Sequence, residues 1–158
     1  MTNTKALSPR HSQLEMWQLV MPEHTNPQNT IFGGVVMSWV DLAGAMCATR
    51  HAKANVVTVH IDSISFKSPI RIGEQVRIMA MINYVGKSSM LVGVKVIAEN
   101  PITSESRHTT TAYLTFVALD GVGNPKPVPP LLLENDEDKR RHAEAVERID
   151  LRKKMVKH

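Results

Sequence analysis

Residues 35–48 read VVMSWVDLAGAMCA and directly follow two glycines, Gly33 and Gly34. The stretch is too long for an ordinary strand, and its apolar residues surround a helix on every side instead of forming one stripe. A helix with that distribution must be covered on all sides by other parts of the protein. The sequence therefore predicts a central helix over residues 35–48 that is packed inside the fold.

The rest of the chain body alternates apolar and polar residues, which is typical of half-buried strands. Strands are predicted at residues 13–20, 55–66, 75–85, 89–98 and 106–119. In the second of these, the apolar set shifts by one position near Asp62, which indicates a bulge or a sharp bend. The short link at residues 86–88 favours an antiparallel meander, so the predicted fold class is α+β.

A central helix and a single sheet leave part of the helix surface to be covered. One sheet covers one side of a helix unless it curls around it, and any remaining apolar surface needs a partner subunit. We therefore expect a sheet that wraps the helix and a homodimer.

The last part of the chain differs in composition from the body. Pro125, Pro127, Pro129 and Pro130 form an extended, stiff run, after which acidic residues precede basic ones in the order that suits a helix dipole. Three pairs stand at i,i+4 and are expected to support this helix: Asp136/Arg140, Glu137/Arg141 and Glu144/Arg148. We predict one domain at residues 1–130 and a charged helical tail at 131–158. The mixed signs favour a solvated face over a nucleic-acid site.

Composition narrows the class of protein further. The chain has 158 residues, 42% of them hydrophobic, and a formal net charge of +4, as expected for one soluble domain. Cys47 is the only cysteine, which excludes an internal disulfide and a multi-cysteine zinc site and fits a reducing compartment. No apolar run approaches the roughly 18 residues of a membrane-spanning helix, and no secretory signal is readable at the start. We expect a cytoplasmic protein with no membrane and no nucleic-acid partner.

Asp41 is the first candidate for chemistry. It lies about two turns into the predicted helix, too deep to cap the N-terminus, and aspartate is a poor helix former in a helix interior. Its neighbours on the same face are apolar or small, so the carboxylate loses hydration and becomes a candidate proton acceptor. The alternative is structural: Asp41 only forms a hydrogen bond with a neighbouring loop or with a partner helix.

The second candidate site is the segment NPQNTIFGG, residues 26–34. Two glycines at the start of a helix leave backbone N–H groups unpaired and unobstructed, which suits an oxyanion or a polarised carbonyl. The amide of Asn26 can orient a water or donate to a carbonyl oxygen. The alternative is an ordinary turn in which asparagine and glycine are chosen for their backbone conformations.

A third segment, Gly86-Lys87-Ser88-Ser89, resembles the end of a phosphate-binding loop. The first glycine of that motif is replaced by Met81 and no strand-loop-helix context exists, so a nucleotide triphosphatase is rejected. A hairpin tip with a lysine and hydroxyls can still contact a ligand phosphate, although it can equally be an exposed turn. The histidines show no metal-ligand spacing, so no metal and no separate cofactor is expected.

Taken together, Asn26, Phe32-Gly33-Gly34, Asp41, the segment from Phe66 to Ile70 and the hairpin from Val85 to Ser89 resemble the hotdog-fold acyl-CoA thioesterases. The similarity is greatest to the broad-specificity cytosolic acyl-CoA hydrolases and runs from about residue 12 to 130. The resemblance implies a long helix wrapped by a curved antiparallel sheet, homodimers, and often a trimer of dimers.

The resemblance also implies a reaction and its residues. Asp41 matches the family's catalytic aspartate and Asn26 its catalytic asparagine, contributed by opposite subunits, while the Gly34 amide polarises the thioester carbonyl. Asp41 activates water as a general base, with direct attack by its carboxylate as the alternative. Asn29 stands where relatives often have glycine, and asparagine tolerates the left-handed conformation that the turn needs.

The coenzyme A part of the substrate is expected at residues that carry phosphate-binding groups. These are Lys67, Gly86, Lys87, Ser88 and Ser89, with Arg141 of a neighbouring subunit as a further possibility. The alternative function is a non-catalytic acyl-CoA-binding regulator of the same fold, in which Asp41 only braces the interface. Nucleic-acid binding through the basic tail is the third hypothesis and is disfavoured by the interleaved acids and the scarcity of aromatic residues.

Overall fold

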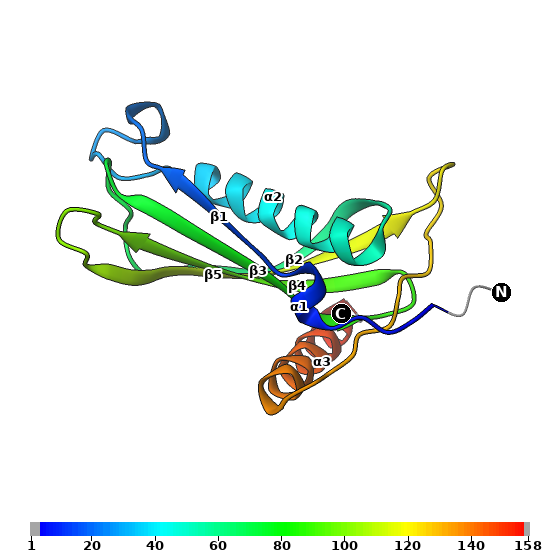
Figure 1. Ribbon diagram of the computed structural model, residues 1–158. Coiled ribbons are helices and arrows are strands. Elements are labelled where there is room, and N and C mark those ends of the chain that lie inside the picture. Colours follow the sequence, from blue (N-terminus) through cyan, green and yellow to red (C-terminus); the bar gives the residue numbers. More distant parts are fainter. Residues whose placement is uncertain (1–3, 157–158) are drawn as a thin grey trace.

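A five-stranded antiparallel sheet forms the body of the computed structural model, which describes residues 4–156. Helix α2 (Gly33–Ala52) lies across one face of the sheet, and helix α3 (Asp136–Val156) lies against the other face near one end (Figure 1). The strands run in the order β1-β3-β4-β5-β2. Their bounds are β1 (Leu14–Leu19), β2 (Asn55–Phe66), β3 (Gln75–Val85), β4 (Ser89–Glu99) and β5 (Ser106–Leu119). A short helix α1 (Pro9–Ser12) and a 3-10 turn η1 (Pro22–His24) flank β1.

The elements agree closely with the predicted ones. All five strands are present, and the register between β2 and β5 shifts on both sides of Ile61, so the irregularity expected near Asp62 is confirmed. The central helix is longer than predicted at both ends, because it includes Gly33 and Gly34 and continues to Ala52. It stops at Lys53, whose φ of 54° is in the left-handed region that ends many helices.

The core lies between α2 and the sheet face beneath it. Val36, Val40, Ala43, Cys47 and Ala48 of α2 are buried against inward-facing residues of β3, β4 and β5. The contact is closest at Gly44, where an added Cβ would lie 2.9 Å from the ring of Phe116. A small residue is therefore required there for the helix to approach the sheet.

The outward side of α2 is not covered by this chain. Met37, Leu42 and Met46 are 38–50% exposed, so the sheet covers one side of the helix and does not wrap it completely. The adjacent strand β2 is an edge strand, and its Val57, Val59 and Ile61 are also exposed. The exposed apolar residues of α2 and β2 therefore lie next to an unpaired strand edge. A partner subunit typically covers a surface of this kind.

Helix α3 docks through two arginines as well as through the buried Ala145. The guanidinium of Arg148 stacks 3.5 Å from the ring centroid of Tyr113, and Arg152 reaches Asp62 at 3.3 Å. Of the predicted i,i+4 pairs, Glu137/Arg141 forms at 3.6 Å. The other two are replaced, because Arg140 pairs with Glu137 and Glu144, and Arg148 turns toward the sheet.

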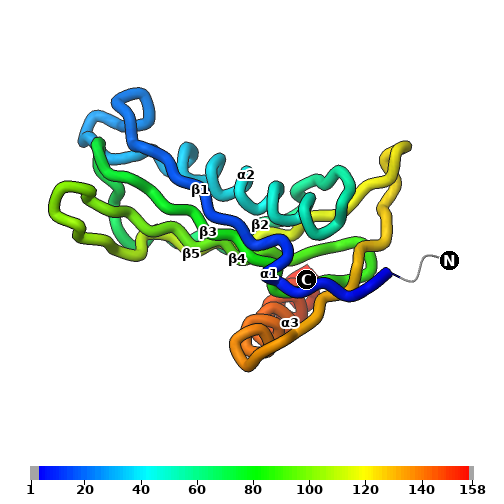
Figure 2. The backbone as a smooth tube through the Cα atoms, viewed as in Figure 1, coloured from blue at the N-terminus to red at the C-terminus, as the bar shows by residue number. Residues whose placement is uncertain are grey.

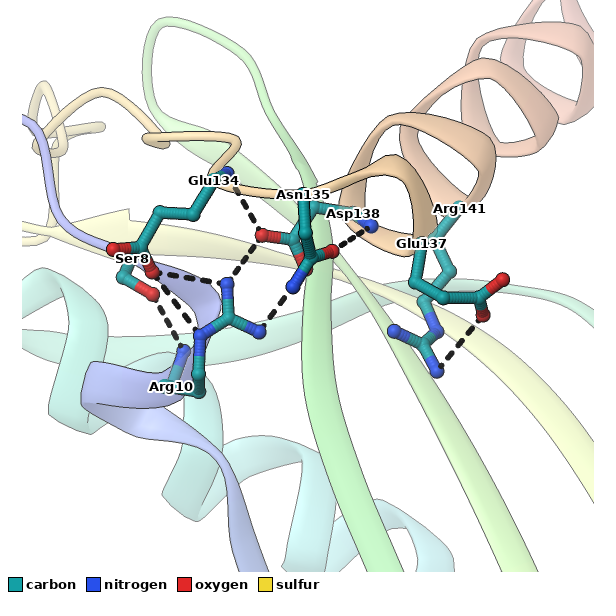
Figure 3. A network of polar contacts seen from close by, with 7 residues as sticks. All are labelled: Ser8, Arg10, Glu134, Asn135, Glu137, Asp138 and Arg141. Carbon is teal, nitrogen blue, oxygen red and sulfur yellow. Dashed lines mark hydrogen bonds and ion pairs between the residues drawn. The ribbon is translucent and has the colours of Figure 1, made fainter.

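A cluster of charged residues joins the start of the chain to the start of α3 (Figure 3). The Arg10 guanidinium contacts Glu134 at 2.9 Å and binds both carboxylate oxygens of Asp138, whose side chain is fully buried. The backbone of Leu7 pairs with that of Pro130 and Leu132, so the two terminal segments run side by side. The predicted tail is thereby tied to the body.

Replacing Asp138 tests this cluster. Asp138→Asn removes the charge that Arg10 binds, and we expect the free energy of unfolding at pH 7 to fall by about 1–3 kcal/mol, as for a buried hydrogen bond to a charged group. Hydrogen bonds from Arg10 hold the pKa of Asp138 below its ordinary value against the effect of burial. The stabilisation is therefore present above about pH 4 and is lost as the pH falls through the lowered pKa.

Denaturant unfolding of the wild type and the variant across pH 3–7 measures this difference. Glu137→Gln is the matched control, since its ion pair with Arg140 is exposed and contributes little. A gap between wild type and Asp138→Asn that persists unchanged at the acid end would contradict the assignment.

Candidate functional site

The first turn of α2 presents free backbone N–H groups. Phe32 is the N-cap residue and supplies no side-chain hydrogen bond, while the Val35 and Val36 amides bond to its carbonyl oxygen. The Gly33 and Gly34 amides have no acceptor among residues 4–156 and stand at the positive end of the helix dipole. An added Cβ at Gly34 would meet nothing within 4 Å, so packing within this chain does not explain the glycine.

Asn26 closes the loop that precedes the helix. Its Oδ1 accepts hydrogen bonds from the Gln28 amide at 3.0 Å and the Thr30 amide at 3.2 Å, and its Nδ2 donates to Thr30 Oγ1 at 3.0 Å. The side-chain amide has two N–H groups, and the second bonds to no residue that the structure describes. Asn29 has a φ of 60°, so the left-handed turn expected there is confirmed.

A cavity of about 270 Å³ opens beside the first turn of α2. Gly33 and Val36 form one wall, and the end of β2 and the following loop form the other, with Phe66, Lys67, Ser68 and Pro69. The structure therefore places Lys67, a predicted coenzyme A contact, next to the free amides of the helix.

Asp41 lies on the open side of α2 and is half-buried. Its Oδ1 accepts a hydrogen bond of 2.7 Å from the hydroxyl of Thr58 on β2. The loss of hydration predicted for this carboxylate is only partial in one chain, because Asp41 is half-buried and Met37 beside it is 38% exposed. Thr58 was not predicted as a site residue, because nothing local in its alternating strand shows which side chain faces the helix.

One protomer does not bring Asp41 and Gly34 to the same point. They are seven residues apart on one face of α2, which is about 10 Å along the helix axis. A group that activates a water at a carbonyl carbon must lie within about one water molecule of it, while the oxyanion donor lies about 3 Å from the carbonyl oxygen. The two functions therefore cannot meet at one substrate within a single chain.

The hairpin at residues 86–89 lies at the other end of the sheet from the cavity (Figure 2). The 11 residues of β3 separate this hairpin from the loop that follows Lys67, a span of roughly 35 Å. The hairpin backbone is fixed, since the carbonyls of Lys87 and Ser88 accept hydrogen bonds from Val128 and Ala118. Lys67 and the hairpin are thus not brought together within one protomer.

Other reactive groups do not compete with this site. Burial raises the pKa of the Cys47 thiol to about 11, so it is not a nucleophile near neutral pH. Within residues 4–156, no cluster of three His, Cys, Asp or Glu side chains has a metal-binding arrangement. No helix in that part of the chain is both long and apolar enough to span a membrane.

Comparison with known proteins gives consistent matches. Residues 28–105 match the Thioesterase superfamily. The chain is 40% identical over 149 residues to the uncharacterized acyl-CoA thioester hydrolase YkhA of Bacillus subtilis, covering 94% of this chain and 87% of that protein. The crystal structure of an apo-hexameric acyl-CoA thioesterase superposes with a TM-score of 0.93 and 38% identity, covering 96% of this chain and 97% of the other.

An acyl-CoA hydrolase from Staphylococcus aureus, solved in complex with butyryl coenzyme A, coenzyme A and coenzyme A disulfide, is also similar. Its TM-score is 0.89 at 36% identity, with 96% of this chain and 92% of that chain covered. Single alanine variants of the same hydrolase replace an asparagine, an aspartate 15 residues after it and a threonine 17 residues after that. Asn26, Asp41 and Thr58 have the same spacing in this chain.

Proposed function

The chain belongs to the Thioesterase superfamily, and we propose that it hydrolyses the thioester of acyl-CoA to free coenzyme A and a carboxylic acid. The observation that carries the proposal is that one helix carries both a half-buried carboxylate, Asp41, and free backbone amides at its start. Relatives with this fold are named acyl-CoA thioester hydrolases, and one was solved with acyl-CoA and coenzyme A.

In the proposed reaction, water attacks the thioester carbonyl carbon while Asp41 accepts a proton from it. The Gly34 amide donates to the carbonyl oxygen as it becomes an oxyanion, and the second N–H of Asn26 donates to the attacking water. The C–S bond then breaks, and the proton passes from Asp41 to the departing thiolate. Thr58 holds the carboxylate by donating to Oδ1, which leaves Oδ2 for the water.

A partner subunit related by two-fold symmetry can bring an Asp41 and a Gly34 close together. If a second α2 lies antiparallel to the first, with the axis between Gly34 and Asp41, each Gly34 faces the Asp41 of the partner and two equivalent sites form. The exposed surface of Met37, Leu42 and Met46 and the free edge of β2 lie on the side where that partner would pack. We therefore propose a homodimer with the site at its seam.

The same symmetry suggests how coenzyme A is held. A two-fold operation that reverses β2 carries the 86–89 hairpin of the partner toward the cavity end of this protomer. Lys67 and the partner's Gly86, Lys87, Ser88 and Ser89 are proposed to contact the coenzyme A moiety. Further assembly into a trimer of dimers is proposed because three similar solved structures are hexameric thioesterases. A cytoplasmic location is proposed because Cys47 is a free thiol.

The first test removes the base. Asp41→Asn keeps the shape of the side chain but cannot accept the proton, so kcat for release of coenzyme A is expected to fall by about 10²–10⁴. Thr58→Val removes one hydrogen bond to a charged group, worth about 1.5–3 kcal/mol, and is expected to lower kcat by about 10–100-fold. Thiol release measured over a series of acyl-chain lengths gives both values.

Asp150→Asn is the matched control, because it removes an exposed carboxylate on α3, far along the chain from the site. Equal turnover in the wild type and Asp41→Asn would remove the proposed base. Tight binding of acyl-CoA with no turnover by the wild type would favour the non-catalytic regulator instead.

Subunit mixing tests the shared site. Asp41→Asn and Asn26→Ala are each expected to be nearly inactive alone. After the two are unfolded together and refolded, half of the dimers are hybrids, and one of the two sites in each hybrid carries neither substitution. We expect the mixture to recover about one quarter of wild-type activity, as random pairing of a two-fold dimer requires.

If Asp41 and Asn26 acted within one chain, every site in the mixture would carry a substitution and no activity would return. Refolded wild type measures the yield of the procedure, and size-exclusion chromatography establishes that the mixture has assembled.

A further inference from the structure

We propose that Arg107 and Glu74 form a positioning pair that fixes the Asn26 loop and the neighbouring cavity wall for catalysis. This inference rests on the proposed function of Asn26. Neither residue lines the cavity beside α2. Glu74 stands just before β3, and Arg107 is the second residue of β5, so the pair links two segments that are 33 residues apart.

The Arg107 guanidinium binds Glu74 in a bidentate, fork-like arrangement. Its Nη1 and Nη2 donate to the two carboxylate oxygens of Glu74 at 2.6 and 2.8 Å, and Nε donates to Ser68 Oγ at 2.9 Å. Nη2 also donates to the Pro69 carbonyl. One planar group thus fixes Glu74, Ser68 and Pro69 together, and the last two belong to the cavity wall.

Glu74 extends this network to the backbone. Its side chain is 9% exposed, and its Oε1 also accepts a hydrogen bond of 2.7 Å from the Arg71 amide. Burial disfavours the charged form, but the hydrogen bonds from Arg107 and Arg71 together hold the pKa of Glu74 below its ordinary value. The carboxylate is therefore ionised at neutral pH and keeps all three donors in place.

Residues 70–72 are in turn joined to the Asn26 loop. The Ile31 amide donates to the Ile70 carbonyl at 2.8 Å, and the Ile72 amide donates to the Asn29 carbonyl at 3.2 Å. Thr30 and Arg71 face each other across this short antiparallel pairing. Because Thr30 also holds the Asn26 side chain, the sequence of contacts from Arg107 to Asn26 is continuous.

Apolar packing anchors these segments at Ile70, which is buried in the core, and at Ile31, which is partly buried against it. Beyond these two, Arg71, Ile72 and Gly73 are exposed, as are residues 27–29 of the facing loop. The exposed positions are therefore held by directional polar contacts, and the Arg107 guanidinium engages both the cavity wall and Glu74. A misplacement of about 1 Å in a group that positions substrate or water can cost about 10²-fold in rate.

Kinetic variants separate positioning from stability. Arg107→Gln and Glu74→Gln are expected to lower kcat by about 10–100-fold with a smaller change in KM, since Asn26 is displaced. Arg107→Lys keeps the charge but not the fork, so it is expected to recover thermal stability without recovering kcat. Full recovery of kcat by lysine would show that charge alone suffices and would overturn the proposal.

A double variant tests whether the pair acts through Asn26. Arg107→Gln in an Asn26→Ala background is expected to cost little beyond Asn26→Ala alone, because the group that it positions is already absent. If the fold-losses in kcat of the two single variants multiply in the double variant, Arg107 acts independently of Asn26 and the proposal is overturned. The matched control is Arg10→Gln, which breaks an ion pair of the same kind far from the site and is expected to leave kcat unchanged.

A measurement without substrate keeps this inference separate from the proposed function. Amide hydrogen exchange at Asn29, Ile31 and Ile72 is expected to rise by at least about tenfold in Arg107→Gln and to stay at the wild-type rate in Arg10→Gln. Unchanged exchange in Arg107→Gln would overturn the positioning role even if the enzyme is active. If exchange is faster in Arg107→Gln but the wild type hydrolyses no acyl-CoA, the positioning network stands and only the proposed function is removed.

Discussion

The structure depends on one constraint: α2 is apolar around its whole circumference, and one sheet covers only one side of it. The covered side is packed closely enough that Gly44 cannot carry a side chain beneath Phe116. The other side carries Met37, Leu42 and Met46 in the open and also Gly34 and Asp41. The surface that needs a partner and the surface that carries the candidate chemistry are therefore the same, which is why assembly and activity are argued together.

Most of the fold could be predicted from the sequence because the signals are local. Alternation gave the five strands and the irregularity near Asp62, and the length and apolar character of residues 35–48 gave the helix. The strand order, with β2 at an edge beside β5, depends on pairings between distant segments that no local pattern reports. The tail shows the same limit, since Arg148 leaves its predicted partner Glu144 for the ring of Tyr113 on the sheet.

Only some residues of the candidate site could be proposed from the sequence. Asp41 could be singled out because aspartate is a poor helix former inside a helix, and Gly34 because two glycines open that helix, whereas the roles of Asn26 and Gly34 came from the family resemblance. Thr58 and the Arg107–Glu74 pair were not predicted, because their roles depend on which side chains the sheet register brings together. The distance between Lys67 and the 86–89 hairpin likewise became clear only from the length and direction of β3.

The structure also changes how the two interpretations of Asn26 relate to each other. The sequence offered a structural turn residue or a catalytic amide as alternatives, but the side chain has enough groups for both. Oδ1 and one N–H hold the Asn26–Thr30 turn, and this fixes the direction of the second N–H. An amide that was free to rotate would lose conformational entropy each time it bound a water or a carbonyl. The structural role therefore prepares the group for the proposed catalytic one, and the contacts of Thr30 with the segment that Glu74 anchors extend that preparation beyond the loop itself.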